Sequence, residues 1–254
     1  MRLVLIPYGT AGIEEAPKKI ATHISKEFSV AENERQVNFK QEFMLVDEED
    51  QESSFQNIEE TLGSSAEPAV VLGGNNSISY PCFKAMKKHS QNPGMVVFDS
   101  RPDMAPGKDV NFYNYLRKMI DDGVINPAKL ILVGLRNWSD EELAYLKRHN
   151  ISHYTMKEIS MEGKEEACDS IMSVARQWDR LYISIDVSIL DPAFVPGSTF
   201  MEPGGMTPRE LLYFLQRLKL LKNLAVADIV EVNTDKDNNE ITTRLAAKIA
   251  VELS

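Results

Sequence analysis

The sequence predicts an α/β fold in which short parallel strands alternate with amphipathic helices. Two observations support this class: apolar runs of strand length alternate with stretches of helical periodicity, and the connections between them are short. The chain has 254 residues, 43% of them hydrophobic, and lacks a Pro/Gly/Ser-rich linker, so we expect a single domain over residues 1–254. A doubly wound open sheet fits this alternation, and a closed barrel shares it.

The predicted strands are short apolar runs bounded by polar or turn-forming residues. They cover residues 3–7, 37–46, 69–72, 95–98, 130–135, 151–154, 181–185 and 224–232. Three of these runs lead directly into Gly73, Asp99 and Asp186. Since the carboxyl ends of parallel strands form the functional site in either architecture, the two acidic residues are candidates for it.

The predicted helices follow from apolar periodicity and from start signals. Pro17 stands where a first helical turn begins, and Ser139 with Glu142 fits a capping box. Residues 49–65 are acidic and polar, which is typical of a solvent-exposed helix. The helices are predicted over residues 17–28, 49–65, 77–89, 111–120, 139–149, 164–178, 207–220 and 240–253.

Composition argues against several classes of partner. The 28 Lys and Arg against 38 Asp and Glu give a net charge of −10, whereas nucleic acids and anionic membranes bind clustered basic residues. No apolar run approaches the roughly 20 residues of a membrane span. Cys82 and Cys168 form no C-x-x-C pair, which favours buried thiols in a reducing compartment. We therefore expect a cytoplasmic protein with neither a nucleic-acid nor a membrane partner.

Residues 181–205 read LYISIDVSILDPAFVPGSTFMEPGG, a strand that ends in Asp186 followed by a loop rich in Pro and Gly. This stretch resembles the signature S-x-D-x-D-x-x-D-P-x-x-x-P-G-T-G-T-P-x-x-G-G of the arginase/agmatinase/formimidoylglutamase (ureohydrolase) family. The matching residues are Ser184, Asp186, Asp191, Pro192, Pro196, Gly197, Gly204 and Gly205. Ser188 stands in place of the signature's second metal-binding Asp, and Thr-Phe-Met at 199–201 in place of its Gly-Thr-Pro.

Three further blocks resemble the family in the same order, each at a predicted strand end. GGNNS at 73–77 corresponds to G-G-D-H-S, DSRPD at 99–103 to D-A-H-x-D, and DIVEVN at 228–233 to D-x-x-E-x-N-P. The resemblance implies an arginase-like fold, which is a three-layer α/β/α domain with a doubly wound, mostly parallel sheet of about eight strands and not a barrel. It also implies a homo-oligomer.

The resemblance implies a metal site as well, because active family members hold two Mn²⁺ ions that share two aspartates, here Asp99 and Asp186. The remaining ligands of the first ion correspond to Asp103 and Asn76, and those of the second ion to Arg101 and Ser188. A guanidinium stays protonated and has no lone pair to give a metal. We therefore expect Arg101 to pair with the aspartates in place of the binuclear centre.

A smaller metal site stays open as an expectation. Asp99, Asp103 and Asp186 would hold at most one Mn²⁺, Mg²⁺ or Ca²⁺ ion, since these hard cations prefer oxygen ligands. The family's proton-shuttling His falls in the stretch KDVNFYNY at 108–115, where Phe112 takes its place. Glu231 matches the family glutamate that pairs with the substrate guanidinium, and Asn76 is the second candidate for ligand binding.

The sequence therefore favours an arginase-family protein without arginase or agmatinase activity that binds a small cationic molecule or a partner. The first alternative is a hydrolase of non-peptide C–N bonds, in amidines or guanidines, that uses one metal ion or an altered site. The second alternative is an unrelated α/β enzyme whose motifs match by accident. A catalytic residue is not assigned, and Asp99, Arg101, Asp103, Asp186 and Ser188 are the remnant site.

Overall fold

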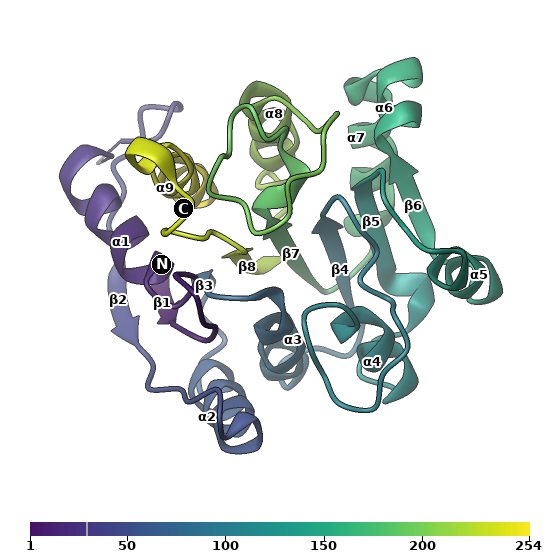
Figure 1. Cartoon of the computed structure of the whole chain (residues 1–254), viewed down its shortest axis with the longest axis horizontal. Helices are drawn as coiled ribbons and strands as arrows, with labels where there is room; N and C mark the ends of the chain where they lie inside the picture. The colour runs from purple at the N-terminus through teal and green to yellow at the C-terminus, as the bar shows by residue number, and fades with distance from the viewer. Residues whose placement is uncertain (29) are drawn as a thin grey trace.

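The structure, a computed structural model, describes residues 1–28 and 30–254 and builds them around one open sheet of eight strands (Figure 1). The strands are β1 (Arg2–Ile6), β2 (Lys40–Phe43), β3 (Ala69–Gly73), β4 (Pro93–Phe98), β5 (Leu130–Leu135), β6 (Ser152–Thr155), β7 (Arg180–Asp186) and β8 (Leu224–Val230). Their order is β2-β1-β3-β8-β7-β4-β5-β6, and all the pairings are parallel. The open order confirms the doubly wound sheet and excludes the barrel.

The described part of the chain has nine α-helices, of which eight lie between strands and the last follows β8. They are α1 (Ala16–Glu27), α2 (Gln51–Gly63), α3 (Ser79–Lys87), α4 (Tyr115–Asp121), α5 (Asp140–Arg148), α6 (Met156–Glu162), α7 (Lys164–Ala175), α8 (Pro208–Leu218) and α9 (Ile241–Leu253). None of them combines the length and the apolar character that a membrane span requires.

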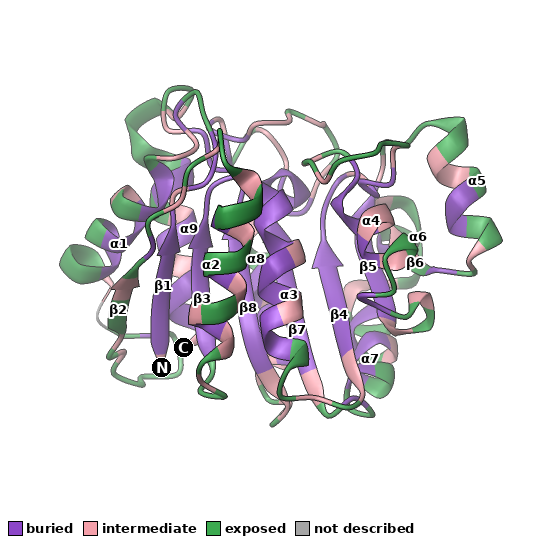
Figure 2. Ribbon diagram, turned by 90° about the horizontal axis from the view of Figure 1, so that it is seen from below, coloured by how far each residue is buried: buried purple, intermediate pink, exposed green. Residues whose placement is uncertain are grey.

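Alternate residues of each strand point to opposite faces of the sheet, so the core has two halves. On β1, Leu3 and Leu5 pack in one half with α1 and the helices α6 to α9, whereas Val4 and Ile6 pack in the other half with α2 to α5. Figure 2 shows the inner strands of the sheet buried between helices whose outer faces are exposed, whereas the edge strand β2 is itself mostly exposed. The two covered faces confirm the predicted three-layer α/β/α class.

The structure differs from the prediction mainly where turns replace helix or a strand is short. The helix expected over 111–120 begins only at Tyr115, because the side chains of Asn111 and Asn114 bond the backbone of the preceding turn. The sequence prediction also missed α6, whose capping box joins Thr155 and Glu158. The strand predicted over 37–46 has four residues, and the Ser139–Glu142 capping box is confirmed.

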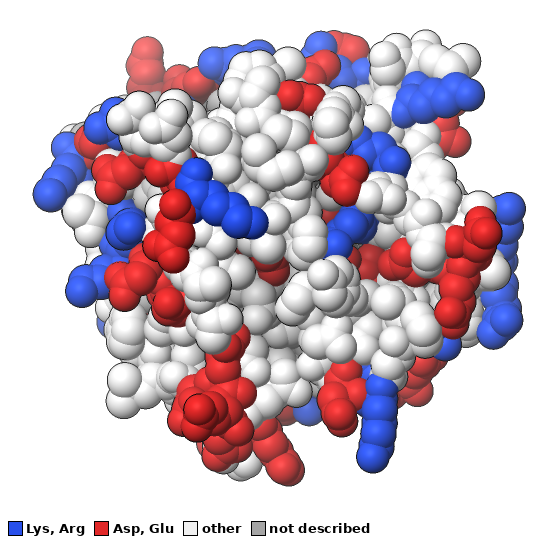
Figure 3. All heavy atoms as spheres, viewed as in Figure 1, with Lys and Arg blue, Asp and Glu red and all other residues white. Residues whose placement is uncertain are grey.

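Four neighbouring strands at the centre of the sheet, β3, β8, β7 and β4, carry the four sequence blocks at their carboxyl ends. Parallel pairing places these ends along one edge of the sheet. On the face seen in Figure 3, acidic and basic side chains lie scattered among uncharged ones, and acidic side chains gather over α2. The sheet thus brings residues that are distant in sequence to one place.

Candidate functional site

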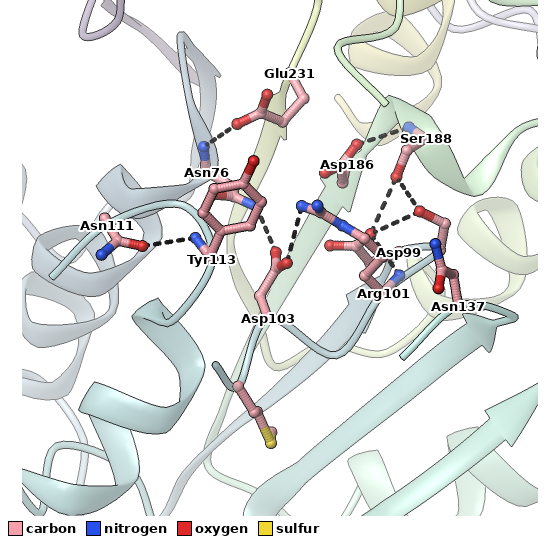
Figure 4. Close-up of polar contacts among 12 residues, drawn as sticks. Asn76, Asp99, Arg101, Asp103, Asn111, Tyr113, Asn137, Asp186, Ser188 and Glu231 are labelled. Atoms are coloured by element: carbon pink, nitrogen blue, oxygen red, sulfur yellow. Dashed lines mark hydrogen bonds and ion pairs between the residues drawn. The ribbon is translucent and has the colours of Figure 1, made fainter. Parts of the chain in front are cut away.

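The polar residues at the central strand ends meet in one buried cluster (Figure 4). Asp99 follows β4, Asp186 is the last residue of β7, and Asp103 lies in the loop after β4. One carboxylate oxygen from each lies within 4.8 Å of the other two, and each side chain is 1% exposed. The structure therefore brings together the three aspartates that the sequence singled out.

Two more of the predicted residues lie beside this cluster, after the ends of β3 and β8. Asn76 begins the 3₁₀ turn after β3 (Asn76–Ile78), and Glu231 directly follows β8. The backbone N–H of Asn76 donates to Oε1 of Glu231 at 2.9 Å, and its side-chain Nδ2 donates to Oδ2 of Asp103 at 2.6 Å. Asn76 therefore links the strand ends as a hydrogen-bond donor.

Arg101 carries the positive charge that directly contacts the aspartates. Its Nη2 donates to Oδ1 of Asp103 at 3.1 Å, and its backbone N–H donates to Oδ1 of Asp99 at 3.0 Å. The side chain is 13% exposed, so it lies nearer to solvent than the carboxylates do. Its Cζ lies 3.4 Å from the ring centroid of Phe200 and 5.1 Å from that of Tyr113. The guanidinium thus has a carboxylate and two aromatic rings as neighbours.

Ser188 also acts as a hydrogen-bond donor toward the aspartates. Its Oγ donates to Oδ1 of Asp99 at 3.0 Å, and its backbone N–H donates to Oδ1 of Asp186 at 2.7 Å. Ser100, which the sequence analysis did not single out, exchanges a hydrogen bond with Ser188 Oγ at 2.9 Å. Ser188 therefore supplies a neutral hydroxyl that holds Asp99 in place.

Several buried polar atoms of the site have no hydrogen-bond partner. In the described part of the chain there are seven such side-chain atoms, and five belong to this cluster. They are Asn76 Oδ1, Asp99 Oδ2, Arg101 Nε, Asp186 Oδ2 and Glu231 Oε2. Leaving a buried acceptor unpaired costs about 1–3 kcal/mol, more when it is charged. Four oxygen acceptors in one buried cluster favour a bound cation or a donor-rich molecule.

Burial and mutual repulsion shift the protonation of the carboxyls. Burial raises the pKa of Asp103 and of Asp186 well above the usual range, and the neighbouring Asp99 adds to it. Burial also raises the pKa of Glu231 to about 7. Arg101 opposes the shifts at the three aspartates and at Glu231. Its own burial acts to lower the guanidinium pKa, but the surrounding carboxylates outweigh this and raise it.

Two of the acidic residues have backbone conformations that L-amino acids rarely adopt. The φ angle is +46° at Asp103 and +66° at Glu231. Non-glycine residues in this region carry strain of order 1–3 kcal/mol and are common at functional sites. The loops therefore hold these two carboxylates in their places at a conformational cost.

An aromatic cluster borders the carboxylates. Phe112 and Tyr113, from the turn before α4, have ring centroids 6.1 Å and 5.9 Å from that of Phe200, which lies in the loop between β7 and α8. Phe112 and Phe200 stand at motif positions of the sequence, whereas no motif position pointed to Tyr113. Its place beside Phe112 in the aromatic stretch at 108–115 is the only signal that could have identified it.

Asp228, also in a matched block, lies outside the cluster. Its carboxylate accepts hydrogen bonds from Ser79 at 2.5 Å, Tyr182 at 2.5 Å and Ser184 at 2.7 Å, and the residue is fully buried. Because these bonds connect α3, β7 and β8, the network fixes the sheet and one helix beneath the site.

The donor set fits one cation better than a pair. Asp99, Asp103 and Asp186 offer carboxylate oxygens that suit a hard ion. Arg101 gives no lone pair, and Asn76 and Ser188 direct N–H and O–H groups at the carboxylates. A pair of metal ions would need further ligands for each ion besides the shared aspartates, and these residues do not supply them.

Comparisons with known proteins identify related chains. The model of the Arginase family matches residues 6–254. Formimidoylglutamase of Bacillus subtilis (strain 168) is 32% identical over 185 residues, which cover 71% of this chain and 58% of that protein. Arginase of Staphylococcus aureus (strain MRSA252) is 29% identical over 197 residues, which cover 71% of this chain and 65% of that protein. The matched region is thus less than two thirds of the length of these relatives.

Solved structures agree with this similarity. The crystal structure of the Bacillus subtilis formimidoylglutamase superposes with a TM-score of 0.92 at 25% identity, covering 99% of this chain and 85% of that chain. The proclavaminate amidino hydrolase from Streptomyces clavuligerus superposes with a TM-score of 0.89 at 25% identity, covering 99% and 89% of the two chains.

Proposed function

Because the chain belongs to the arginase family, we propose that it is a member that binds a small cationic molecule and lacks arginase and agmatinase activity. The observation that carries this proposal is the ion pair between Arg101 and Asp103 within the aspartate cluster. In the reaction that the family resemblance implies, a pair of Mn²⁺ ions would lower the pKa of a bound water for attack on the guanidinium carbon. A side-chain guanidinium supplies positive charge but cannot coordinate that water.

The charges of the site favour a cation as the ligand. Four buried acidic side chains, Asp99, Asp103, Asp186 and Glu231, outnumber the positive charges near them, which are Arg101 and the half-buried Arg136. Uncompensated buried charge is costly, so an added cation that donates hydrogen bonds would be stabilised there. In this proposal, Asp99, Asp186 and Glu231 use their unpartnered oxygens to hold the ligand, and Asn76 adds its carbonyl oxygen.

A second candidate function is hydrolysis of an amidine or guanidine C–N bond with one metal ion. The spacing of the Asp99, Asp103 and Asp186 oxygens supports it, because three carboxylates suit a single Mn²⁺, Mg²⁺ or Ca²⁺ ion. Such an ion would act as a Lewis acid. Asp103 would first have to give up the donors Asn76 and Arg101.

The test combines metal content with activity. The purified protein is equilibrated with excess MnCl₂, desalted and measured by elemental analysis, with the Bacillus subtilis formimidoylglutamase as the positive control. Arginine, agmatine, guanidinobutyrate and formimidoylglutamate are then screened for urea or formamide release. We expect less than a full pair of manganese ions and no product. A full pair with product release would contradict the proposal, and one ion with product release would favour the second candidate.

A further inference from the structure

The Arg101 guanidinium contacts two kinds of partner, a carboxylate and aromatic rings. Asp103 accepts its hydrogen bond at 3.1 Å, and the ring of Phe200 lies with its centroid 3.4 Å from the guanidinium carbon. Tyr113 adds a second ring at 5.1 Å. A planar delocalised cation is favoured both over an aromatic face and beside a carboxylate, whereas an ammonium group does not match both partners equally well. The side chain is therefore bound in the way that a free guanidinium ligand would be bound.

The guanidinium and the two aromatic rings come from three separate segments of the chain. Arg101 lies in the loop after β4, Tyr113 in the turn before α4 and Phe200 in the loop between β7 and α8. Figure 4 shows the Tyr113 ring in front of Asn76, between Glu231 and Asp103, and the Arg101 guanidinium directed at Asp103. Tyr113 is 46% exposed and Arg101 13% exposed, whereas Asp99 and Asp186 are 1% exposed. The guanidinium thus lies on the solvent side of Asp99 and Asp186, and the space that it fills beside Asp103 is termed the acidic pocket.

The acidic residues around this pocket keep buried polar atoms without hydrogen-bond partners. Asp99 Oδ2, Asp186 Oδ2 and Glu231 Oε2 are buried without a partner, and so is the Nε of Arg101 itself. Arg101 therefore pairs with only some of the acceptors around the pocket, and its own Nε–H has no acceptor. A bound state that leaves donors and acceptors unpaired is open to competition by a ligand that pairs them.

From this geometry we propose that Arg101 is a tethered occupant of the acidic pocket, held by Phe200 and Tyr113, and that a free planar cation binds only by displacing it. The inference rests on the proposed function, in that the pocket must bind a cation at all. Displacement requires rotation of the long Arg101 side chain toward solvent. Because the pocket is binding-competent only in that state, the apparent affinity of the free chain is reduced by the fraction of molecules in which Arg101 is out.

The test measures binding of the guanidinium ion by calorimetry at constant ionic strength, with urea as the neutral analogue of the same shape. Arg101→Ala and the longer Arg101→Met remove the tethered cation. If Arg101 leaves the pocket in about a tenth of the molecules, the variants should bind guanidinium about tenfold more tightly than the wild type does. Urea should show no saturable binding to any of them.

Further variants keep the test decisive if the loss of Arg101 prevents folding. Phe200→Ala retains every charge of the site and should give a Kd between those of the wild type and Arg101→Met. Arg217→Ala removes one positive charge in the last turn of α8, which leads to the amino end of β8 and not to its carboxyl end, where the site lies. This variant should bind guanidinium as the wild type does. Far-UV circular dichroism establishes that each variant is folded.

Two results would overturn the inference. One is an equal guanidinium Kd for the wild type, Phe200→Ala and a folded Arg101 variant; the other is no saturable binding to any folded variant. Both differ from failure of the proposed function, which is judged on wild-type manganese content and product release. A protein that holds a pair of manganese ions and releases urea refutes the proposed function, whatever the guanidinium affinities are.

Discussion

The side-chain amide of Asn76, after β3, donates a hydrogen bond of 2.6 Å to Oδ2 of Asp103, in the loop after β4. Arg101 donates to the other oxygen of the same carboxylate at 3.1 Å, so both oxygens of Asp103 have protein donors. Asp99 and Asp186 each keep one oxygen without a partner. A cation in the cluster therefore finds unpaired oxygens on Asp99 and Asp186, and it binds Asp103 only by replacing an existing bond.

Restoring the residues that the family resemblance implies should restore metal binding. In the triple variant Asn76→His, Arg101→His, Ser188→Asp, two imidazoles and a carboxylate replace a donor amide, a guanidinium and a hydroxyl. Neutral imidazole and carboxylate are metal ligands, so we expect the variant to retain more Mn²⁺ per chain than the wild type. Elemental analysis and titration calorimetry measure this. Arg101→His alone is the matched control and should give a smaller gain, and a folded triple variant with wild-type manganese content would show that the positions are wrongly assigned.

Replacing Asp186 by Asn should stabilise the fold at neutral pH. Burial and the neighbouring carboxylates raise the pKa of Asp186, so its charged form is unfavourable in the folded state. A neutral amide of the same shape removes the repulsion, and its oxygen can still accept from the backbone N–H of Ser188. We expect the free energy of unfolding to rise by about 0.5–2 kcal/mol in urea denaturation.

Asp191→Asn is the matched control for that substitution. The carboxylate of Asp191 accepts backbone N–H groups of Ala193, Gly204 and Gly205, which lower its pKa. An amide would present an NH₂ group to one set of these donors, so this variant should lose stability. If both variants shift in the same direction, repulsion within the aspartate cluster is not what limits stability.

Stability should fall as the pH rises through the range in which Glu231 ionises. Burial raises the pKa of this carboxyl from 4.5 to about 7 in the folded chain. Between these values the folded state keeps a proton that the unfolded state has released, so stability decreases as pH rises and levels off above about 7. The total change is on the order of 3 kcal/mol.

Glu231→Gln should flatten this part of the pH profile, because the amide does not titrate. Denaturation curves collected from mildly acidic to mildly alkaline pH give the comparison. The same substitution at the exposed Glu60 of α2 should leave the profile as it is in the wild type. An unchanged slope in Glu231→Gln would contradict the assigned role of this carboxyl.

Gly74 should tolerate no side chain. A Cβ at this position would lie 1.9 Å from the backbone oxygen of Tyr8, and backbone cannot move away as a flexible side chain can. The same segment bonds Glu231, whose N–H donates to the Gly74 carbonyl at 2.9 Å. We expect Gly74→Ala to cost about 3 kcal/mol or more and to weaken cation binding.

Gly63→Ala provides the comparison for Gly74. A Cβ at Gly63 would meet the far end of the Lys88 side chain at 3.0 Å, and that chain can rotate away. The melting temperatures of the two variants should therefore differ clearly, with Gly74→Ala the lower of the two. Equal melting temperatures would mean that the close approach of Gly74 to Tyr8 does not constrain the fold.

Part of the site was accessible from the sequence because it depends on strand ends. Asp99 and Asp186 each close an apolar run, and parallel neighbours must place such residues side by side, as β4 and β7 do. Tyr113 carried no comparable signal, since it lies in a predicted helix that the structure replaces by a turn held by Asn111 and Asn114. Local side-chain to backbone bonds decided that segment, and helical periodicity does not report them.

The sequence by itself determined the alternation of strands and helices, because hydrophobic periodicity fixes which elements form and which face is buried. Its family motifs, and not periodicity, indicated the open three-layer sheet and most of the acidic residues at one edge of it. Only the tertiary structure decided what surrounds Arg101. Its contacts with Phe200 and Tyr113 join loops that follow different strands, and they depend on how β4 and β7 are packed and on which way each side chain turns. Such contacts depend on distances between elements far apart in the chain, which local patterns of residues do not specify.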